Sequence, residues 1–426
     1  MLQGNLVFKG YGDPKLNLEQ FWLWLRELRQ RGLREIRGDI VLDCSFFDEG
    51  VHDPAEFDND PTRAYNVGPN ALLLNLNALH LRVIPNAGQA NALLEPDLSG
   101  YAIKNRIRTA TKQPCKGGDT YSARLEERNI VLEGTIPADC GEVEEYFSLL
   151  PHGEYFFAVF SALWQELGGT LQGKMRVGNA PDNQVVFSTH RSPPLSDVIR
   201  DINKFSNNTM ARQVFLTLGT IPSAGAATNS ALAPAFQSIS PVPMADTPPS
   251  ELAPDNQLSD NAEAEPEQPD AGSTASGNAK PLRCDPSSNI ARSTAVMRQW
   301  LNSRQLHFPE LILENGSGLS RVERISPQSL ADLLQHAAHS PFYAELAASL
   351  PILGMDGTMK KRFKDNEIAG YAHLKTGMLE GVKSLAGYVQ AKSGEQWIVV
   401  FLINHPNAKH GQAAQDALIE WVQKRH

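Results

Sequence analysis

The chain of 426 residues contains only four cysteines, no long apolar run and no extended block of basic residues. Four cysteines cannot form a disulfide framework in so long a chain, and a chain of this length can bury a large core instead. No apolar run approaches the roughly 20 residues of a membrane-spanning helix, so we expect no transmembrane segment. The first 15 residues also lack the charged and apolar regions of a secretory signal.

Metal-ligand patterns and basic patches are also absent from the sequence. The 11 histidines are scattered, with no Cys-x-x-Cys and no His-x-x-x-His, so we expect neither a metal nor another cofactor. The 39 Lys and Arg residues stand against 48 Asp and Glu, which gives a net charge of −9. Because no basic block would follow a phosphate backbone, nucleic acid is not expected as a partner.

The N-terminal half predicts a strand, a helix and a strand, followed by a β-rich region over about 70–150. Apolar residues recur at helical spacing from Leu18 to Leu28, after the capping residue Asn17 and before Gly32. Residues 72–84 alternate with period two, which predicts a strand with one wet face. A second helix is predicted at about 154–167, followed by two glycines that can end it.

The C-terminal half begins with a segment of different composition and ends with regular structure. Residues 222–287 are dense in Pro, Ala, Ser, Asp and Glu, which predicts a disordered insertion. Tyr371–Lys375, Gly387–Ala391 and Trp397–Ile403 then predict three strands, and a helix over 413–424 follows them. Short turns predict that these strands are antiparallel neighbours. The fold class is therefore α/β, an antiparallel sheet with helices on its faces.

The cysteines leave two interpretations open. Cys115 and Cys140 flank a predicted hairpin over 121–136, whose turn could bring the two thiols together. A disulfide between them is one interpretation, and two free thiols in a reducing compartment are the other. Cys44 and Cys284 have no obvious mate in the sequence, so we expect both to be free.

A polar triplet interrupts a helical stretch, Asp197 to Leu218, near the middle of the chain. Ser206-x-Asn208 predicts a turn there that points its side chains into a cleft. In acyl transfer, a hydroxyl so placed can relay a proton to the leaving amine, and a carboxamide can hold a substrate amide. The alternative is a solvent-facing polar turn, and the triplet alone does not decide between them.

A second triplet, Lys375-Thr376-Gly377, is predicted at the end of a strand. A cation and a hydroxyl can hold a substrate carboxylate there, while glycine leaves room for a peptide to lie along the strand. The next backbone amide, of Met378, would be available as an oxyanion donor. The alternative is an ordinary strand end.

Seven segments of the sequence together carry a resemblance to a known family. They are, in order, GNLVFKGYGDPKL, RGDIVLD, YNVGPNALLLNLN, KFSNNTMARQVFLTLG, ENGSGLSR, MDGTMKKRF and HLKTGMLEGVKSLAGYV. The chain resembles the class C low-molecular-mass penicillin-binding proteins, the D-alanyl-D-alanine carboxypeptidase and endopeptidase family, over nearly all its length except the insertion. The resemblance implies a transpeptidase domain of the β-lactamase type, residues 186–221 and 288–426, with inserted α/β and β-rich domains over 1–185.

The resemblance also implies a function and assigns roles to the two triplets. It implies a serine-type peptidase that cleaves peptidoglycan stem peptides in the periplasm through an acyl-serine intermediate. β-Lactam antibiotics would be covalent inhibitors of the full-length form. Ser206 and Asn208 match the family's second motif, and Lys375, Thr376 and Gly377 match its third.

Other residues acquire interpretations from the same resemblance. Arg321 matches a family arginine near the cleft, so it is either a substrate contact or a salt-bridged surface residue. Asp356 and Gly357 are expected to shape a turn. Cys115 and Cys140 fall where family members can carry a cysteine pair, which supports the disulfide interpretation.

The family's nucleophile motif, Ser-x-x-Lys, does not occur, because no serine in the chain has lysine three residues later. In the family this motif, an export signal and the first strands precede the GNLVFKGYGDP segment, close to which this chain begins. Loss of the nucleophile costs about 10⁶ in rate in a well-studied serine protease. We therefore expect the chain as given to be inactive, and residues 186–426 to be poorly folded alone.

Three functional hypotheses follow. The first is a D-Ala-D-Ala carboxypeptidase or endopeptidase whose coding region starts further upstream. The second is a noncatalytic peptidoglycan-binding or interaction module. A β-lactamase fits poorly, because such enzymes seldom carry a large domain between the first two motifs. An acidic loop with Asp53, Asp58 and Asp60 could meet the amine of a diaminopimelate side chain, or could simply be a solvated loop.

Overall fold

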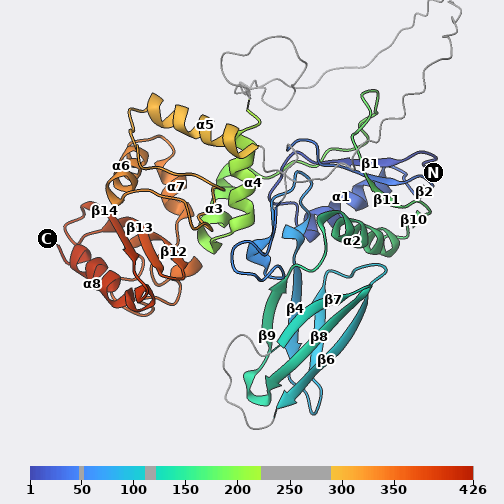
Figure 1. The fold of residues 1–426 in the computed structure, drawn as a ribbon, viewed down its shortest axis with the longest axis horizontal. Coiled ribbons are helices and arrows are strands. Elements are labelled where there is room, and N and C mark those ends of the chain that lie inside the picture. The colour runs from blue at the N-terminus through green and yellow to red at the C-terminus, as the bar shows by residue number, and fades with distance from the viewer. Residues whose placement is uncertain (48–51, 111–120, 222–288, 426) are drawn as a thin grey trace, which may run out of the picture. The chain divides into compact units, whose positions relative to one another are not determined.

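The computed structural model describes residues 1–47, 52–110, 121–221 and 289–425 (Figure 1). All of these residues belong to one compact unit, which spans 1–222 and 282–426. The predicted disordered insertion, 222–287, lies outside the described residues. None of the described helices is both long and apolar enough to cross a bilayer.

The N-terminal part has the predicted strand, helix and strand. β1 (Leu6–Lys9), β3 (Ile40–Asp43) and β11 (Met175–Val177) form a parallel sheet in the order β1-β3-β11, and β2 (Glu35–Ile36) pairs with β10 (Thr170–Leu171). α1 (Leu18–Gln30) begins at Asn17, whose side chain accepts a hydrogen bond from the Gln20 N–H at 2.8 Å. α2 (His152–Glu166) buries four aromatic side chains against this region, which explains its largely apolar sequence.

The β-rich region consists of two three-stranded sheets. One has the order β5 (Asn91–Glu95), β4 (Leu79–Ile84), β9 (Val143–Phe147), and the other has β6 (Ala102–Ala110), β8 (Asn129–Pro137), β7 (Tyr121–Glu126). β7 and β8 form the predicted hairpin. The prediction of a strand from residue 72 was wrong, since β4 begins only at Leu79. Asn75, Leu76 and Asn77 adopt left-handed φ values of 47°, 54° and 53°, which an extended strand cannot contain.

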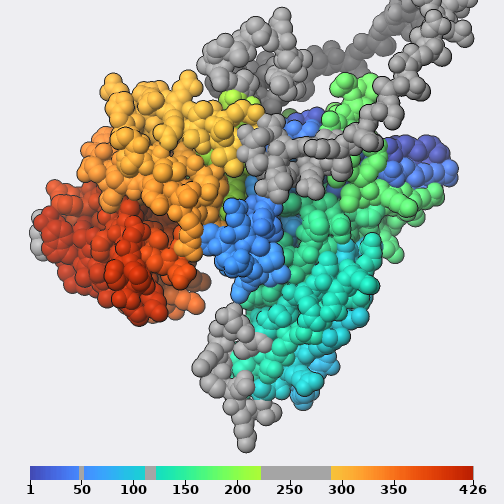
Figure 2. Space-filling view, viewed as in Figure 1, coloured from blue at the N-terminus to red at the C-terminus, as the bar shows by residue number. Residues whose placement is uncertain are grey.

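The C-terminal part contains the predicted antiparallel sheet, in the order β12-β13-β14. Its strands are β12 (Ala372–Leu379), β13 (Val382–Gln390) and β14 (Gln396–Asn404), and its helices are α5 (Asn289–Ser303), α6 (Pro327–Ala338), α7 (Tyr343–Ser349) and α8 (Gln412–Gln423). α8 contributes Ile419 and Val422 to the core beneath the sheet. α6 packs on β14. In the space-filling view the orange and red parts of the chain, which contain these two elements, adjoin (Figure 2).

The second triplet, Lys375-Thr376-Gly377, lies inside a strand and not at its end, which corrects the prediction. β12 continues two residues past Gly377 to Leu379, which pairs with Val382. The continuation is possible because Gly381 takes a φ of +72° in a two-residue turn, a conformation that glycine adopts without steric cost. The triplet therefore has a paired strand on one side along its whole length.

The cysteines partly contradict the sequence prediction. Cys44 is disulfide-bonded, so the expectation of a free thiol was wrong, and Cys140 is disulfide-bonded as well. The sequence around Cys44 gives no sign of a disulfide, because the bond depends on how distant segments of the chain pack together. Cys115 and Cys284 lie outside the described residues, so the Cys115–Cys140 pairing stays a prediction.

Candidate active site

The Ser206 turn is formed where two helices meet. α3 (Leu195–Phe205) ends at Ser206, which has a left-handed backbone with φ 55° and ψ 47°. α4 (Asn208–Leu218) begins directly afterwards, capped by the Asn207 side chain, which accepts the Met210 N–H at 2.9 Å. A left-handed serine costs roughly 1–2 kcal/mol. The structure therefore contains the predicted turn between the two helices, whereas the cleft into which its side chains should point stays a prediction.

Lys375 joins the two triplets directly. Its Nζ donates hydrogen bonds to Ser206 Oγ and to the Thr376 carbonyl oxygen, both at 2.7 Å. Burial lowers the pKa of the Lys375 amine to about 8, because the charged form loses solvation. A larger fraction of this amine is neutral near pH 7 than of an ordinary lysine. The hydroxyl and the amine thus form a pair that can pass a proton.

The other two residues of the second triplet, Thr376 and Gly377, each have a close neighbour. Thr376 Oγ1 lies 3.0 Å from Thr358 Oγ1, so the two hydroxyls stand together. A Cβ on Gly377 would lie only 2.4 Å from Ser384 Oγ on the neighbouring strand, so a larger residue here would force the Ser384 side chain to rotate. The side chain of Met378 is 72% exposed, and the role of its N–H as an oxyanion donor stays a prediction.

Asn208 lies on the first turn of α4 and faces the N-terminal half of the chain. Its Nδ2 is 3.5 Å from the Tyr65 carbonyl oxygen, a contact at the outer limit of a hydrogen bond. The next residue, Thr209, is buried and donates from Oγ1 to the Val67 carbonyl oxygen at 3.2 Å. The carboxamide of Asn208 is therefore positioned by its neighbours but only weakly engaged.

Arg321 contacts the turn that follows β12, at Glu380. Its NH1 donates to the Glu380 carbonyl oxygen at 3.1 Å, and its NH2 is 4.0 Å from a Glu380 carboxylate oxygen. The guanidinium also stands 4.8 Å from the centroid of the Phe57 ring, at cation–π distance. Both interpretations of this arginine stay open, because its side chain is half-exposed near β12 and also pairs weakly with a surface glutamate.

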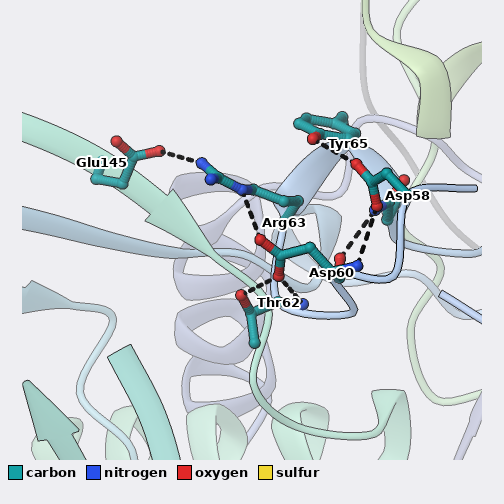
Figure 3. Close-up of polar contacts among 7 residues, drawn as sticks. Asp58, Asp60, Thr62, Arg63, Tyr65 and Glu145 are labelled. Carbon is teal, nitrogen blue, oxygen red and sulfur yellow. Dashed lines mark hydrogen bonds and ion pairs between the residues drawn. The ribbon is translucent and has the colours of Figure 1, made fainter. Parts of the chain in front are cut away.

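The acidic loop is held together by its own hydrogen bonds (Figure 3). Asp58 accepts from the Tyr65 hydroxyl and from Asn66 Nδ2, both at 2.7 Å, and Asp60 accepts from the Thr62 hydroxyl at 2.6 Å and from Arg63 Nε at 2.8 Å. Burial opposes ionisation of Asp58, but these hydrogen bonds lower its pKa. Occupied carboxylates of this kind favour a structural role for the loop over the binding of a substrate amine.

Two residues near the triplets were missed by sequence reasoning as site residues. Lys204 is 5% exposed and forms an ion pair with Asp356, and Thr358 contacts Thr376. A lysine two residues before Ser206, on a helix that is apolar on one face, was the available signal for the first. No group of three or more His, Cys, Asp and Glu side chains within the described ranges could hold a metal ion.

Comparisons with known proteins find similar chains over nearly the whole length. A family model described as D-Ala-D-Ala carboxypeptidase 3 (S13) matches residues 1–240 and 277–425. The D-alanyl-D-alanine carboxypeptidase DacB of Haemophilus influenzae is 23% identical over 412 residues, which are 95% of this chain and 72% of that protein. The D-alanyl-D-alanine carboxypeptidase of Actinomadura sp. strain R39 is 24% identical over 435 residues, 97% of this chain and 68% of that protein.

The fold is similar to that of a solved relative. The crystal structure of penicillin binding protein 4 (dacB) from Haemophilus influenzae superposes with a TM-score of 0.65 at 19% identity, covering 97% of this chain and 82% of that one. A complex of the same protein with a novel β-lactam gives a TM-score of 0.61 at 18% identity, covering 98% and 83%. These likenesses confirm the predicted fold class.

Proposed function

Since the chain belongs to the D-Ala-D-Ala carboxypeptidase 3 (S13) family of low-molecular-mass penicillin-binding proteins, we propose that it recognises peptidoglycan stem peptides ending in D-Ala-D-Ala. The observation that carries this proposal is the 2.7 Å hydrogen bond between Lys375 Nζ and Ser206 Oγ. The bond brings two family motifs together at one point, although 169 residues separate them. Serine-type D-Ala-D-Ala hydrolysis is the activity of the family.

Each residue of the site has a role in this proposal. Ser206 stands where, in family members that carry the nucleophile, a hydroxyl would relay a proton to the leaving D-alanine amine, and Lys375, whose pKa of about 8 lies near neutrality, would exchange that proton with it. The hydroxyl of Thr376 and the Lys375 cation hold the terminal carboxylate. The peptide lies along β12, where Gly377 leaves room for its backbone.

Three further residues complete the substrate site. Asn208 turns its carboxamide from the weak 3.5 Å contact with Tyr65 to an amide of the substrate. The N–H of Met378 serves as an oxyanion donor. Arg321 contacts the acyl-donor part of the peptide from its place beside Glu380 and Phe57.

The proposal includes a limit on the chemistry of this chain. None of its serines is followed by lysine three residues later, so the 426 residues lack the family's nucleophile motif. We therefore propose that the chain as given binds stem peptides without forming an acyl-serine intermediate. The alternative is a noncatalytic module with another peptidoglycan or protein ligand.

The proposed compartment is the periplasm. Cys44 and Cys140 are disulfide-bonded, and such bonds persist in oxidising compartments and are rare in the cytosol. Peptidoglycan stem peptides are also present in the periplasm and accessible to a protein there. Fractionation of cells, with detection of the protein by antibody, tests this compartment directly.

Two measurements on the purified 426-residue protein test the function. A fluorescent penicillin followed by denaturing electrophoresis should give no stable band, whereas a band abolished by unlabelled penicillin would reveal a nucleophile that the sequence does not predict. Isothermal calorimetry with an acetylated tripeptide ending in D-Ala-D-Ala should show binding that Lys375→Met abolishes and Lys383→Met leaves unchanged. Absence of binding by a folded wild-type sample would refute the stem-peptide proposal.

A further inference from the structure

A buried ion pair lies directly behind the Ser206 turn. Lys204, near the end of α3, is 5% exposed, and its Nζ donates to the Leu350 carbonyl oxygen at 2.6 Å. The same Nζ lies 3.0 Å from Asp356 Oδ1 and 2.7 Å from Asp356 Oδ2. Burying an ammonium group is costly unless hydrogen bonds and an opposite charge compensate it. The lysine therefore anchors α3 to the segment that carries both partners.

This segment, residues 350–359, which we call the 350–359 turn, is fixed to α3 at two further points. Gly357 has a φ of +54°, and a Cβ there would lie 2.6 Å from the Lys204 carbonyl oxygen, so the two backbones are in close contact. Just before the turn, Ser349 Oγ accepts a hydrogen bond from Asn203 Nδ2 at 2.7 Å. Asp356 also accepts the Ile352 N–H at 2.7 Å, which closes the turn on itself.

The opposite side of the 350–359 turn is bonded to β12. The Leu353 N–H donates to the Ala372 carbonyl oxygen, and the Leu374 N–H donates to the Pro351 carbonyl oxygen, both at 2.9 Å. Thr358 Oγ1 then lies 3.0 Å from Thr376 Oγ1. The same ten residues therefore contact the helix that ends at Ser206 and the strand that carries Lys375.

We propose that Lys204 and Asp356 are positioning residues, which hold Ser206 at hydrogen-bonding distance from Lys375 through the 350–359 turn. Their ion pair also places the Thr358 hydroxyl beside that of Thr376, so that two hydroxyls face the terminal carboxylate of a bound peptide. This last role rests on the proposed function, whereas the spacing of Ser206 and Lys375 does not.

Stability alone is a weaker explanation of the pair. The Asp356 side chain is 39% exposed, which limits the strength of the ion pair, while Lys204 is almost fully removed from water. Replacing a buried charged pair by apolar residues of similar size is often neutral or stabilising. A geometric role explains why Lys204 contacts the 350–359 turn at two places, the Leu350 carbonyl oxygen and the Asp356 carboxylate.

The test measures the environment of the Lys375 amine and not turnover. Competitive labelling with limiting acetic anhydride at a series of pH values, followed by peptide mass spectrometry, gives the titration midpoint of each lysine. The variants are Lys204→Met and Asp356→Ala. The matched control is Lys15→Met, which removes an ion pair that joins Asp201 of α3 to another segment at 2.6 Å.

The wild type and Lys15→Met should titrate at Lys375 near pH 8. In Lys204→Met and Asp356→Ala the midpoint should rise by one pH unit or more, because α3 and β12 separate and water reaches the amine. The neutral fraction at pH 7 then falls about tenfold per pH unit. Lys204→Arg, which keeps the charge, should restore most of the wild-type midpoint.

An unchanged midpoint in both variants, with only a lower melting temperature by circular dichroism, would show that the pair merely stabilises the fold. A Lys375 midpoint near 10.5 in the wild type would also overturn the proposal, since the amine would then be solvated and not held against Ser206. If single variants fail to fold, the double variant Lys204→Met/Asp356→Leu removes both charges and should still show the raised midpoint. The proposed function can fail while this inference holds. In that case the wild type does not bind the tripeptide, but the titration midpoint of its Lys375 amine still lies near pH 8.

Discussion

Replacement of Lys375 by methionine should make the fold more stable at pH 7. Methionine keeps the length of the side chain but carries no charge. Burial lowers the pKa of the Lys375 amine to about 8 from the 10.5 of an exposed lysine. The folded state therefore binds the proton less tightly than the unfolded state does, and at pH 7 it bears the cost of a poorly solvated cation.

The size of the effect follows from the two pKa values. The difference between 10.5 and about 8 corresponds to about 3 kcal/mol, at about 1.4 kcal/mol per pH unit. Methionine also loses the hydrogen bonds to Ser206 and Thr376, each of which contributes about 1 kcal/mol. Because the lysine side chain is only partly buried, we expect a net gain of about 1 kcal/mol in the free energy of unfolding.

The dependence on pH distinguishes this effect from ordinary repacking. A folded-state pKa below the unfolded value means that the unfolded state binds more protons between pH 8 and 10.5, so the wild type gains stability as pH rises through that window. The full penalty is present below pH 8. Methionine cannot titrate, so the advantage of Lys375→Met should shrink as pH rises and reverse by about pH 10.

Urea unfolding followed by circular dichroism at pH 7, 8.5 and 10 measures this difference, and other titrating groups largely cancel between variant and wild type. Lys383→Met is the matched control, because Lys383 lies on the neighbouring strand with its Nζ 3.5 Å from Gln412 Oε1. A Lys375→Met variant that is less stable than the wild type at pH 7, or whose difference does not change with pH, would refute the reasoning.

Two other predictions concern a glycine and a histidine. Gly377→Ala should destabilise the fold by about 0.5–1.5 kcal/mol, because the new Cβ meets Ser384 Oγ at 2.4 Å and turns that hydroxyl away from the Gly377 carbonyl oxygen, to which it donates at 3.3 Å. Adding Ser384→Ala should cause little further loss in a double-mutant cycle of urea unfolding, because the hydrogen bond is then already absent. Purely additive effects would contradict the clash. Burial lowers the pKa of His152 to about 4 from 6.5, so stability should fall by about 1–3 kcal/mol as pH drops from 6.5 to 4. His152→Gln should flatten this dependence, and an unchanged pH profile in the variant would contradict it.

Local patterns were sufficient for several parts of the fold. The capping residue Asn17 was predictable from spacing alone, and the antiparallel sheet β12-β13-β14 followed from three apolar runs with short turns. The polar interruption at Ser206 predicted a turn, which the structure places between α3 and α4. Each of these signals depends on residues that are close in sequence.

Other features depend on contacts between distant segments and could not be predicted. The approach of Lys375 to Ser206 was implied by a family resemblance, and the spacing of the residues gave no indication of it. The ion pair between Lys204 and Asp356 joins residues 152 positions apart, and the bonded state of Cys44 has no local signal. The left-handed run that begins at Asn75 overrode an alternating pattern, because backbone and tertiary contacts outweigh β-propensity there.

The segments that carry Ser206 and Lys375 are joined by contacts among described residues. Ser206 is bonded directly to Lys375, and the 350–359 turn connects their helix and strand a second time. Two independent connections make the spacing of the pair a property of this half of the site, one that does not require a Ser-x-x-Lys nucleophile. Peptide binding and penicillin acylation can therefore be separated: a chain without the nucleophile should retain the first and lack the second. Loss of tripeptide binding in Lys204→Met would trace the binding geometry to that second connection.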